Sequence, residues 1–430
     1  MLIALLLAAN TAAGLEGLDT IYPKLDALYL DLHQSPELSM HEEKTAAKMA
    51  AQLKSFGYTV TTGVGGTGVV GILSNGKGPT VLIRTELDAL PVEEKTGLPY
   101  ASKVTTLDPA GKTVPVMHAC GHDVHMSGWI GAAALLAQHK NLWRGTVMMV
   151  GQPGEETVAG ARAMIADGLF TRFPKPDFAI AVHDSSGEPA GKVLFVPGYA
   201  MANVDSVDVT LFGRGGHGAK PDTTIDPILI AARTIIGFQT LISREKDPLE
   251  PAVLTVGSIH AGTKHNIVPD DAHLQITVRS FSPETRKLLL DGIVRISKAE
   301  SMAARSPKEP EIKFSQAQDA TYNDPATTRR LAAAIAKQLG EANVVEGKPE
   351  TVAEDFGEFG KAAKIPSVQL RVGAVEPARY AAAVADHTPM PSLHSSGFAP
   401  DREKTIKTAT TALTLSALEL LGKPGTTPSN

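Results

Sequence analysis

The stretch GTVMMVGQPGEE (residues 145–156) is a short apolar run that ends in two adjacent carboxylates, Glu155 and Glu156. An apolar run of this length predicts a buried strand. The stretch FAIAVHD (residues 178–184) repeats the pattern, with His183 at its end. Helical patterns lie beside these strands at about residues 123–139 and 159–167. Strands that alternate with helices predict an α/β fold with a mainly parallel central sheet flanked by helices.

Further elements extend this pattern in both directions. Two helices are predicted near the start, over residues 19–33 and 39–57, and the second opens with the capping-box spacing Ser39-x-x-Glu42. Strands are predicted over residues 58–62, 69–74 and 81–90. Near the end of the chain, a helix is predicted from about residue 327, a strand over residues 367–373 and a last helix over residues 401–421.

The order of elements changes between residues 203 and 315, where the pattern is βαββαβ. This order is that of a ferredoxin-like domain. We therefore predict a catalytic domain in two parts, residues 17–202 and 316–422, interrupted by a lid or dimerisation domain over residues 203–315. The tail, residues 423–430, is rich in Gly, Pro and Thr and is predicted to be disordered.

The overall composition excludes some classes of protein. The chain has 430 residues and a net charge of -5, which favours neither nucleic acid nor an anionic membrane as a partner. No internal apolar run approaches the length of a membrane span. Residues 2–9 are all apolar and small residues follow up to Ala13, so residues 1–16 suggest a signal peptide and a periplasmic or secreted protein. The alternative is a frayed helix on a cytoplasmic protein.

Two glycine-rich stretches resemble nucleotide-binding motifs without their context. Gly63, Gly65 and Gly68 satisfy G-x-G-x-x-G, but a strand follows them where the dinucleotide motif requires a helix. The P-loop-like spacing that ends in Lys77 continues with Gly78, where a Ser or Thr would bind magnesium. We interpret both as turns, and residues 73–84 as a hairpin around Asn75-Gly76. A G-x-S-x-G motif is absent from the sequence, which weakens a serine hydrolase.

The only cysteine lies among histidines in MHACGHDVHM (residues 117–126). Thiolate and imidazole both suit zinc-like divalent ions, so four ligand-type residues within eight positions indicate a metal site. Glu155, Glu156 and His183 stand at strand ends, where sites gather in open α/β sheets. Neighbouring carboxylates can divide the work, with one as ligand and the other as general base. The four ligand-type residues are His118, Cys120, His122 and His125.

At this point the sequence resembles the dinuclear-metal aminoacylase/carboxypeptidase family of metallopeptidases. The branch is that of hippurate hydrolases and of plant hydrolases of indoleacetyl–amino acid conjugates. The resemblance covers about residues 20–422 and rests on ordered motifs. These are MHACGHD, QPGEE, the strand-end His183, GGHGAKP, KHNIVPD, TVRSF, AEDFG and LHSSGF. Gly154 and Thr85 depart from the family pattern, which often has Ala at both places, but neither departure removes a ligand.

The resemblance implies a metal centre of two divalent ions, zinc or manganese, with cobalt or nickel as further choices. Cys120 would be the bridging or shared anionic ligand, and Glu155 would be the general base. A single cysteine cannot form an intramolecular disulfide, so both oxidising and reducing compartments are compatible with the chain. Asp88 would orient a ligating histidine. The implied ligands are Cys120, His122, Glu156, His183 and His394.

The resemblance also assigns residues of the predicted lid. His217 would stabilise the oxyanion, often from a partner subunit, and Asn266 and Arg279 would meet the polar end of the substrate. A surface ion pair is the alternative for Arg279. His118 and Asp123 would either support a ligand or pack in the core, and His125 would either point the same way as His122 or pack. Lys264 and His265 in the lid stay without an assigned role. Glu354 and Asp355 in AEDFG occupy a family motif near the site, with helix capping as the alternative.

We therefore expect a metal-dependent amidohydrolase that cleaves the amide bond of N-acyl amino acids. The alternative with the same site is a metallocarboxypeptidase or dipeptidase acting on short peptides. A binding-only relative would lack a base or a ligand, and a thiol-redox protein would need a second cysteine. The expected partners are a small-molecule substrate and a second copy of the chain, joined through the lid.

Overall fold

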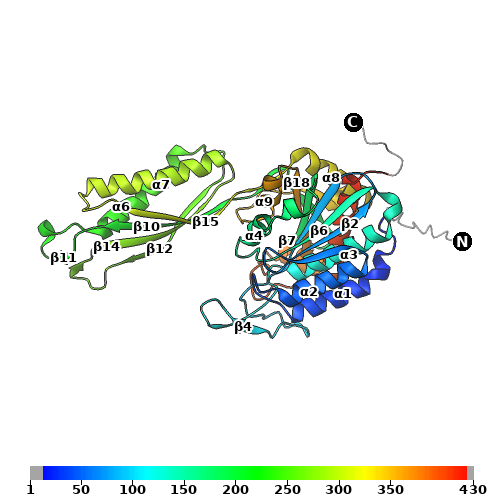
Figure 1. The fold of residues 1–430 in the computed structure, drawn as a ribbon. Coiled ribbons are helices and arrows are strands. Elements are labelled where there is room, and N and C mark those ends of the chain that lie inside the picture. The colour runs from blue at the N-terminus through cyan, green and yellow to red at the C-terminus, as the bar shows by residue number, and fades with distance from the viewer. Residues whose placement is uncertain (1–12, 424–430) are drawn as a thin grey trace. The chain divides into compact units, whose positions relative to one another are not determined.

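The computed structural model describes residues 13–423 (Figure 1). They divide into two compact units, the first made of residues 13–198, Asn323–Lys348 and residues 355–423. The second unit is made of Tyr199–Tyr322 and Pro349–Glu354. The apolar residues 2–9 and nearly all of the tail lie outside the described part of the chain. Within it, no helix has the length and apolar character that crossing a membrane requires.

The first unit is built on an eight-stranded sheet with the order β1-β2-β6-β3-β7-β18-β8-β17. Its centre is parallel, because β3 pairs in parallel with β6 and β7, and β7 pairs in parallel with β18. The predicted α/β class is confirmed. The strands are β1 (Thr59–Val64), β2 (Gly68–Asn75), β3 (Thr80–Glu86), β6 (Gly145–Gln152), β7 (Phe178–Pro189), β8 (Val193–Phe195), β17 (Val344–Glu346) and β18 (Ser367–Val375).

Helices cover both faces of this sheet. Successive side chains of a central strand point to opposite faces, and both sets are buried. In β3, Val81 and Ile83 join one core cluster and Leu82 joins another. The first cluster packs under α1 (Leu18–Gln34), α2 (Glu43–Ser55), α3 (His122–Gln138), α8 (Pro325–Leu339) and α11 (Arg402–Leu420). The second packs under α4 (Gly160–Ala166), α5 (Leu169–Arg172) and α9 (Gly357–Ala363). A small hairpin of β4 (Thr105–Leu107) and β5 (Thr113–Pro115) and the helix α10 (Pro377–Ala385) complete the unit.

The hairpin predicted over residues 73–84 is wrong. β6 lies between β2 and β3, antiparallel to the first and parallel to the second. Gly76 does turn the chain at a φ of 83°. However, the side chain of Asn75 donates to the carbonyl oxygens of Lys140 and Trp143, at 2.6 Å each, on the segment that leads into β6. A turn-forming pair therefore fixes the local bend, whereas β6, from a later segment of the chain, takes the position between the two strands.

The capping box predicted at the start of α2 is also wrong. Neither Ser39 nor Glu42 makes a side-chain cap, and Glu42 itself is the N-cap residue. The Ser39 hydroxyl donates to Asp88 Oδ2 at 2.6 Å instead. The buried carboxylate of Glu42 accepts from the Gly154 amide at 2.8 Å and from the Thr67 hydroxyl. Tertiary contacts with the loops beside the sheet thus replace the local bonds that the spacing favours.

The second unit is a four-stranded antiparallel sheet with the order β12-β14-β10-β15, the order of a split βαβ fold. Two helices with side-chain N-caps, Asp226 and Ser282, pack on one face of it. The elements are β10 (Val204–Phe212), α6 (Pro227–Thr240) with a π-helical end (Leu241–Glu245), β12 (Val253–Ala261), β14 (Asp271–Arg279), α7 (Pro283–Ala303) and β15 (Glu311–Gln318). Short strands β11 (Gly216–His217) and β13 (Ile267–Val268) pair with each other, as do β9 (Gly198–Met201) and β16 (Thr321–Asn323).

Candidate metal centre

Polar side chains gather at the carboxyl edge of the central sheet. Because β3 pairs in parallel with both β6 and β7, their carboxyl ends meet at one edge. Glu86 ends β3, Glu155 and Glu156 follow β6, and His183 lies in β7. Each of these residues lies in or directly after an apolar run that we predicted to be a strand, and the sheet brings the four side chains to one edge.

The turn into α3 brings Cys120 and His122 to the same edge. Gly121 connects them with a φ of 72°, a left-handed conformation that favours glycine. A Cβ atom at this position would also lie 2.3 Å from Asp184 Oδ2. Gly121 therefore allows the chain to turn sharply into the helix, so that the side chains on either side of it lie at the sheet edge.

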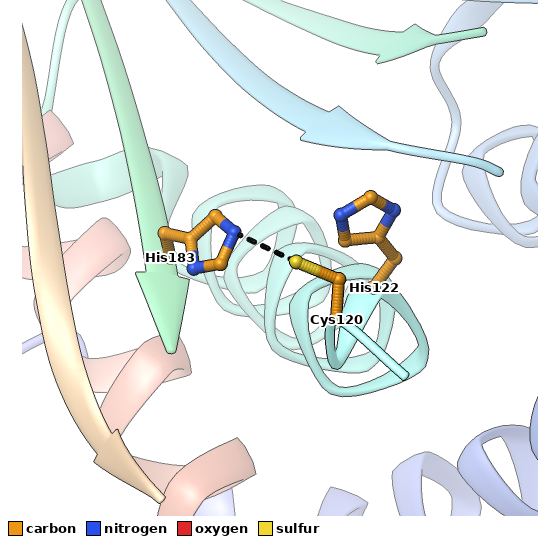
Figure 2. Close-up of side chains that lie close together, drawn as sticks. All are labelled: Cys120, His122 and His183. Carbon is orange, nitrogen blue, oxygen red and sulfur yellow. Dashed lines mark hydrogen bonds between the residues drawn. The ribbon is translucent and has the colours of Figure 1, made fainter. Parts of the chain in front are cut away.

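Figure 2 shows Cys120, His122 and His183 close together, with the Cys120 Sγ atom 3.5 Å from His183 Nε2. The ligand atoms of these three residues lie within 4.8 Å of one another. Two donors bound to one zinc-like ion are about 3 to 4 Å apart, because each metal–ligand bond measures about 2.0 to 2.3 Å. The three buried side chains are thus spaced for one ion.

A second group shares the thiol. His394 Nε2 lies 3.2 Å from Cys120 Sγ and 3.4 Å from Glu156 Oε1. His394 has a φ of 64°, unusual for a residue with a side chain, and its amide donates to the Ala119 carbonyl at 2.8 Å. The backbone is thus held in a strained conformation where its ring meets the cysteine. Since Cys120 belongs to both groups, its sulfur lies between them.

Glu155 lies beside these groups. Its Oε2 atom is 3.9 Å from His122 Nε2, and Glu156 Oε1 is at the same distance from that nitrogen. Gly154 precedes the pair with a φ of 55°, and a Cβ there would lie 2.6 Å from Met40 Sδ. Glycine stands here where the family often has Ala, and the local backbone leaves no room for a side chain at position 154.

Asp88 contacts His122 mainly through its backbone. The Asp88 carbonyl is 2.8 Å from His122 Nδ1, whereas its carboxylate Oδ1 is 3.5 Å from that nitrogen. Its Oδ2 accepts from the Glu156 amide at 3.0 Å. Asp88 thus links the ring of His122 to the loop that carries Glu156.

The donor atoms fit a bound cation. His122 and His183 each place Nδ1 2.8 Å from a main-chain carbonyl, which leaves Nε2 as the nitrogen directed toward the cluster. This arrangement is typical of metal-ligating imidazoles. Among the described residues, none makes a hydrogen bond to His122 Nε2 or Glu156 Oε1, although both atoms are buried. Buried polar atoms without partners are costly, and a metal ion would satisfy both.

The charges around the cluster also favour a cation. Burial raises the pKa of the Cys120 thiol well above its ordinary value, and the carboxylates of Glu156 and Glu155 raise it further. Burial by itself lowers the pKa of His122. The hydrogen bond to Asp88 and the nearby carboxylates outweigh it and raise this pKa to about 10. Both shifts reflect an excess of negative charge, and a metal ion would neutralise it and convert the thiol to a thiolate.

Three buried residues that we did not assign to the site contact it. Asp184 follows His183 directly, and Glu86 stands two residues before Asp88. His125 lies between them, with Nδ1 3.0 Å from Glu86 Oε2 and Nε2 2.8 Å from the Asp184 amide nitrogen. Glu86 ends β3, and Asp184 ends the apolar run FAIAVHD although β7 continues to Pro189, so the rule that selected Glu155 and Glu156 also pointed to both acidic residues.

Two other residues of the first metal segment, His118 and Asp123, are not among the ligand groups. Asp123 Oδ2 is 2.7 Å from Nδ1 of His33, on α1. His118 is buried, neither of its ring nitrogens has a partner among the described residues, and burial lowers its pKa to about 4. Neither residue has a ligand atom in the groups described above.

Asp355 of AEDFG is buried in the first unit. Its Oδ1 accepts from Arg84 Nη2 at 3.1 Å and from Gln152 Nε2 at 2.7 Å, and its Oδ2 accepts from the Ala161 amide at 3.1 Å. The N-cap of α9 is Phe356, without a side-chain cap, so the alternative that this motif caps the following helix is not met. Glu354 belongs to the second unit, where its carbonyl accepts from the Thr321 hydroxyl at 3.2 Å.

The second unit brings two of its three candidate residues together. His217 in β11 pairs with Ile267 in β13, and the Asn266 carbonyl accepts from the Gly218 amide at 2.9 Å. Lys264 and His265 are exposed on the same turn. Arg279 is half-buried at the far end of β14, a nine-residue strand that begins just after this turn. Within this unit, Arg279 is therefore separated from His217 and Asn266 by about 30 Å of strand.

Similarity to known proteins identifies the family of this chain. Residues 82–395 match the model of peptidase family M20/M25/M40. A hippurate hydrolase of Campylobacter jejuni is 38% identical over 334 residues, which cover 76% of this chain and 82% of that protein. A thermostable carboxypeptidase of Saccharolobus solfataricus is 37% identical over 333 residues, 76% of this chain and 80% of that protein.

A solved structure is similar over nearly its whole length. It is a dinuclear metal-binding peptidase of the M20 family from Bacillus subtilis, 28% identical, with a TM-score of 0.76 and coverage of 94% of this chain and 100% of that chain. The chain belongs to peptidase family M20/M25/M40. The resemblance drawn from the motifs is confirmed, and the protein is a metal-dependent hydrolase that acts on amide bonds.

Proposed function

We propose that this enzyme cleaves the amide bond of N-acyl amino acids and releases a carboxylic acid and a free amino acid. The observation that carries the proposal is the group of buried ligand atoms around Cys120, with a second carboxylate, Glu155, beside it. A ligand set with an adjacent base is the arrangement that metal-assisted hydrolysis requires. The residues proposed to hold the two metal ions are Cys120, His122, Glu156, His183 and His394.

The donor types support a particular class of metal. A thiolate, three imidazoles and a carboxylate together suit zinc and related divalent ions better than calcium or magnesium. We propose zinc or manganese, with cobalt or nickel as substitutes. Because Cys120 Sγ belongs to both groups, its thiolate would be available to both ions. When bound, the ions supply Lewis acidity to the scissile carbonyl and lower the pKa of water.

The chain's own residues carry the proton. Glu155 accepts one proton from the attacking water at a carboxylate oxygen and passes it to the nitrogen of the leaving amino acid. The carbon–nitrogen bond breaks as the new carbon–oxygen bond is completed. Asp88 holds the adjacent Glu156 amide at 3.0 Å, which fixes the loop from which both glutamates project.

The substrate class follows from what the similar enzymes share. Hippurate is N-benzoylglycine, and the last residue of a peptide is likewise an amino acid with an acylated nitrogen. The names hippurate hydrolase and carboxypeptidase therefore describe one bond type with different acyl groups. We propose the N-acyl amino acid as the preferred substrate, and short peptides as the alternative.

We also propose roles for the second unit. His217 and Asn266, which share the β11–β13 turn, would stabilise the oxyanion and bind the polar end of the substrate, and Arg279 would pair with a carboxylate. Leu229 and Ile236 of α6 are exposed, which supports a homodimer formed through this unit. An unchanged kcat in His217→Ala would remove the oxyanion role.

Export through residues 1–16 is a further proposal, which N-terminal sequencing of the mature protein would test.

The experiment measures free amino acid released from a panel of N-acyl amino acids and dipeptides. It uses protein loaded with zinc or manganese and a chelated sample in parallel. We expect release that is lost on chelation and returns with metal, and that is fastest for an N-acyl amino acid. Faster release from dipeptides would favour the alternative, and no release from any compound would contradict the proposal.

A further inference from the structure

A buried chain of polar contacts runs from β3 to the proposed metal ligands. Arg84, with 1% of its surface exposed, contacts Glu86 through Nη1 and donates from Nε to Gln152 Oε1 at 2.8 Å. The other oxygen of Glu86 lies 3.0 Å from His125 Nδ1. Because Arg84 anchors the Glu86 carboxylate, the first turn of α3 is fixed to the central strand.

The chain continues through the backbone of Asp184. The Asp184 amide donates to His125 Nε2 at 2.8 Å, and the Asp184 carbonyl accepts from His183 Nδ1 at 2.8 Å. The rings of His125 and His183 also pack edge to face, with centroids 4.5 Å apart. One peptide group on each side of the Asp184 Cα thus connects the buried His125 to the proposed ligand His183.

The side chain of Asp184 reaches the other proposed ligands. Its Oδ2 lies where a Cβ of Gly121 would come within 2.3 Å, so the carboxylate packs against the Cys120–Gly121–His122 turn. Its Oδ1 is 3.3 Å from His125 Nε2. No described residue donates a hydrogen bond to either oxygen, although Asp184 is only 1% exposed. The carboxylate therefore lies between the turn and the two rings.

We propose that Glu86, His125 and Asp184 are positioning residues of the metal centre. His125 holds Asp184, and Asp184 in turn fixes the ring angle of His183 and the path of the turn that carries Cys120 and His122. The inference rests on the proposed ligand set. Its physical basis is that an imidazole binds metal well only when the acceptor at its other nitrogen fixes the ring orientation.

An imidazole suits position 125 because it is both a donor and an acceptor on opposite sides of one rigid ring. Nδ1–H donates to Glu86, so Nε2 is left to accept the Asp184 amide. Phenylalanine has a similar size but can make neither contact. Asparagine can reproduce the donor at Nδ1 but not the acceptor at Nε2.

The test is a titration of the metal-free full chain with cobalt(II), followed by visible absorption, which reports the geometry of the ligands. In His125→Phe we expect cobalt affinity to fall about 10- to 100-fold, with altered absorption bands. His125→Asn, which keeps the donor to Glu86, should recover part of the affinity. The matched control is His33→Phe, which breaks the buried histidine–carboxylate contact between α1 and Asp123 of α3. This variant should leave cobalt affinity and absorption bands unchanged.

Glu86→Gln keeps the shape of the side chain and provides a milder variant if His125→Phe does not fold. Both are compared at a temperature where thermal melts show folded protein. Cobalt affinity and bands equal to wild type in Glu86→Gln and in a folded His125→Phe would overturn the positioning role but leave the ligand set intact. Failure of the wild-type chain itself to bind cobalt would overturn the metal centre and the inference together.

Discussion

Two buried clusters meet at the first turn of α3, and their hydrogen bonds differ. On one side, His33 places Nδ1 2.7 Å from Asp123 and Nε2 3.2 Å from Glu94, so both ring nitrogens have carboxylate partners. On the other side, His122 Nε2 and Glu156 Oε1 lack hydrogen-bond partners among the described residues. The residues that begin these clusters, His122 and Asp123, are adjacent in the sequence.

The comparison separates a structural cluster from a metal site. Burial lowers the pKa of His33, but the hydrogen bonds to Asp123 and Glu94 outweigh it and raise this pKa to about 10, as for His122. A displaced pKa therefore does not distinguish the two histidines. What distinguishes them is that both nitrogens of His33 have carboxylate partners, whereas His122 Nε2 has no hydrogen-bond partner among the described residues and lies within a group of ligand-type atoms.

The largest expected effect is on the metal side. Glu155→Gln removes the proton acceptor but keeps the shape, so kcat should fall about 10²- to 10⁴-fold. Metal content, measured by elemental analysis, should not change, because Glu156 is the proposed ligand. Full activity in this variant would exclude Glu155 as general base. Loss of metal together with activity would make it a ligand instead.

The His33 cluster should respond in stability. His33→Phe leaves two buried carboxylates without their partner, which costs about 3 to 5 kcal/mol in the free energy of unfolding. Urea denaturation measures this loss. The kcat of the metal-loaded folded variant should stay near that of wild type. A large fall in kcat with little change in stability would show that this cluster belongs to the catalytic site.

Metal removal should lower stability through the proposed metal site and not through the His33 cluster. Free metal at 100 times its Kd stabilises the folded chain by about 2.7 kcal/mol, because the ion binds the folded state. We expect chelation to lower the melting temperature of both wild type and His33→Phe. The loss in unfolding free energy on chelation should be the same for the two proteins. Calorimetry with and without chelator checks both. An unchanged melting temperature on chelation would contradict a bound metal ion.

The effect of pH is expected on the side of the His33 cluster. His33 has a pKa raised from 6.5 to about 10 in the folded protein, so its contribution to stability is complete below pH 6.5 and is lost as pH rises through about 10. The difference in unfolding free energy between wild type and His33→Phe should therefore shrink between about pH 6 and about pH 9. A difference that stays constant over this interval would show that the pKa of His33 is not raised in the folded chain.

The sequence predicted the α/β class because apolar runs with polar ends report burial residue by residue. It also placed Glu156 and His183 at one sheet edge, since the carboxyl ends of parallel strands meet there. Cys120 and His122 were indicated by their clustering in one short segment, and only the structure brought them to the same edge. The strand order was harder. Nothing between residues 73 and 84 indicates that β6 separates β2 from β3, because this pairing depends on a segment about 70 residues further along the chain.

Chemical type and chain position were thus determined by the sequence itself: which side chains can bind a cation, and which strand ends carry them. The tertiary structure alone decided which atoms face each other. It directed Ser39 to Asp88 and Glu42 to Gly154 and not to a helix cap, and it placed His125 between Glu86 and Asp184. Hydrogen bonds between distant segments depend on how the helices pack on the sheet, and local spacing carries no record of that packing.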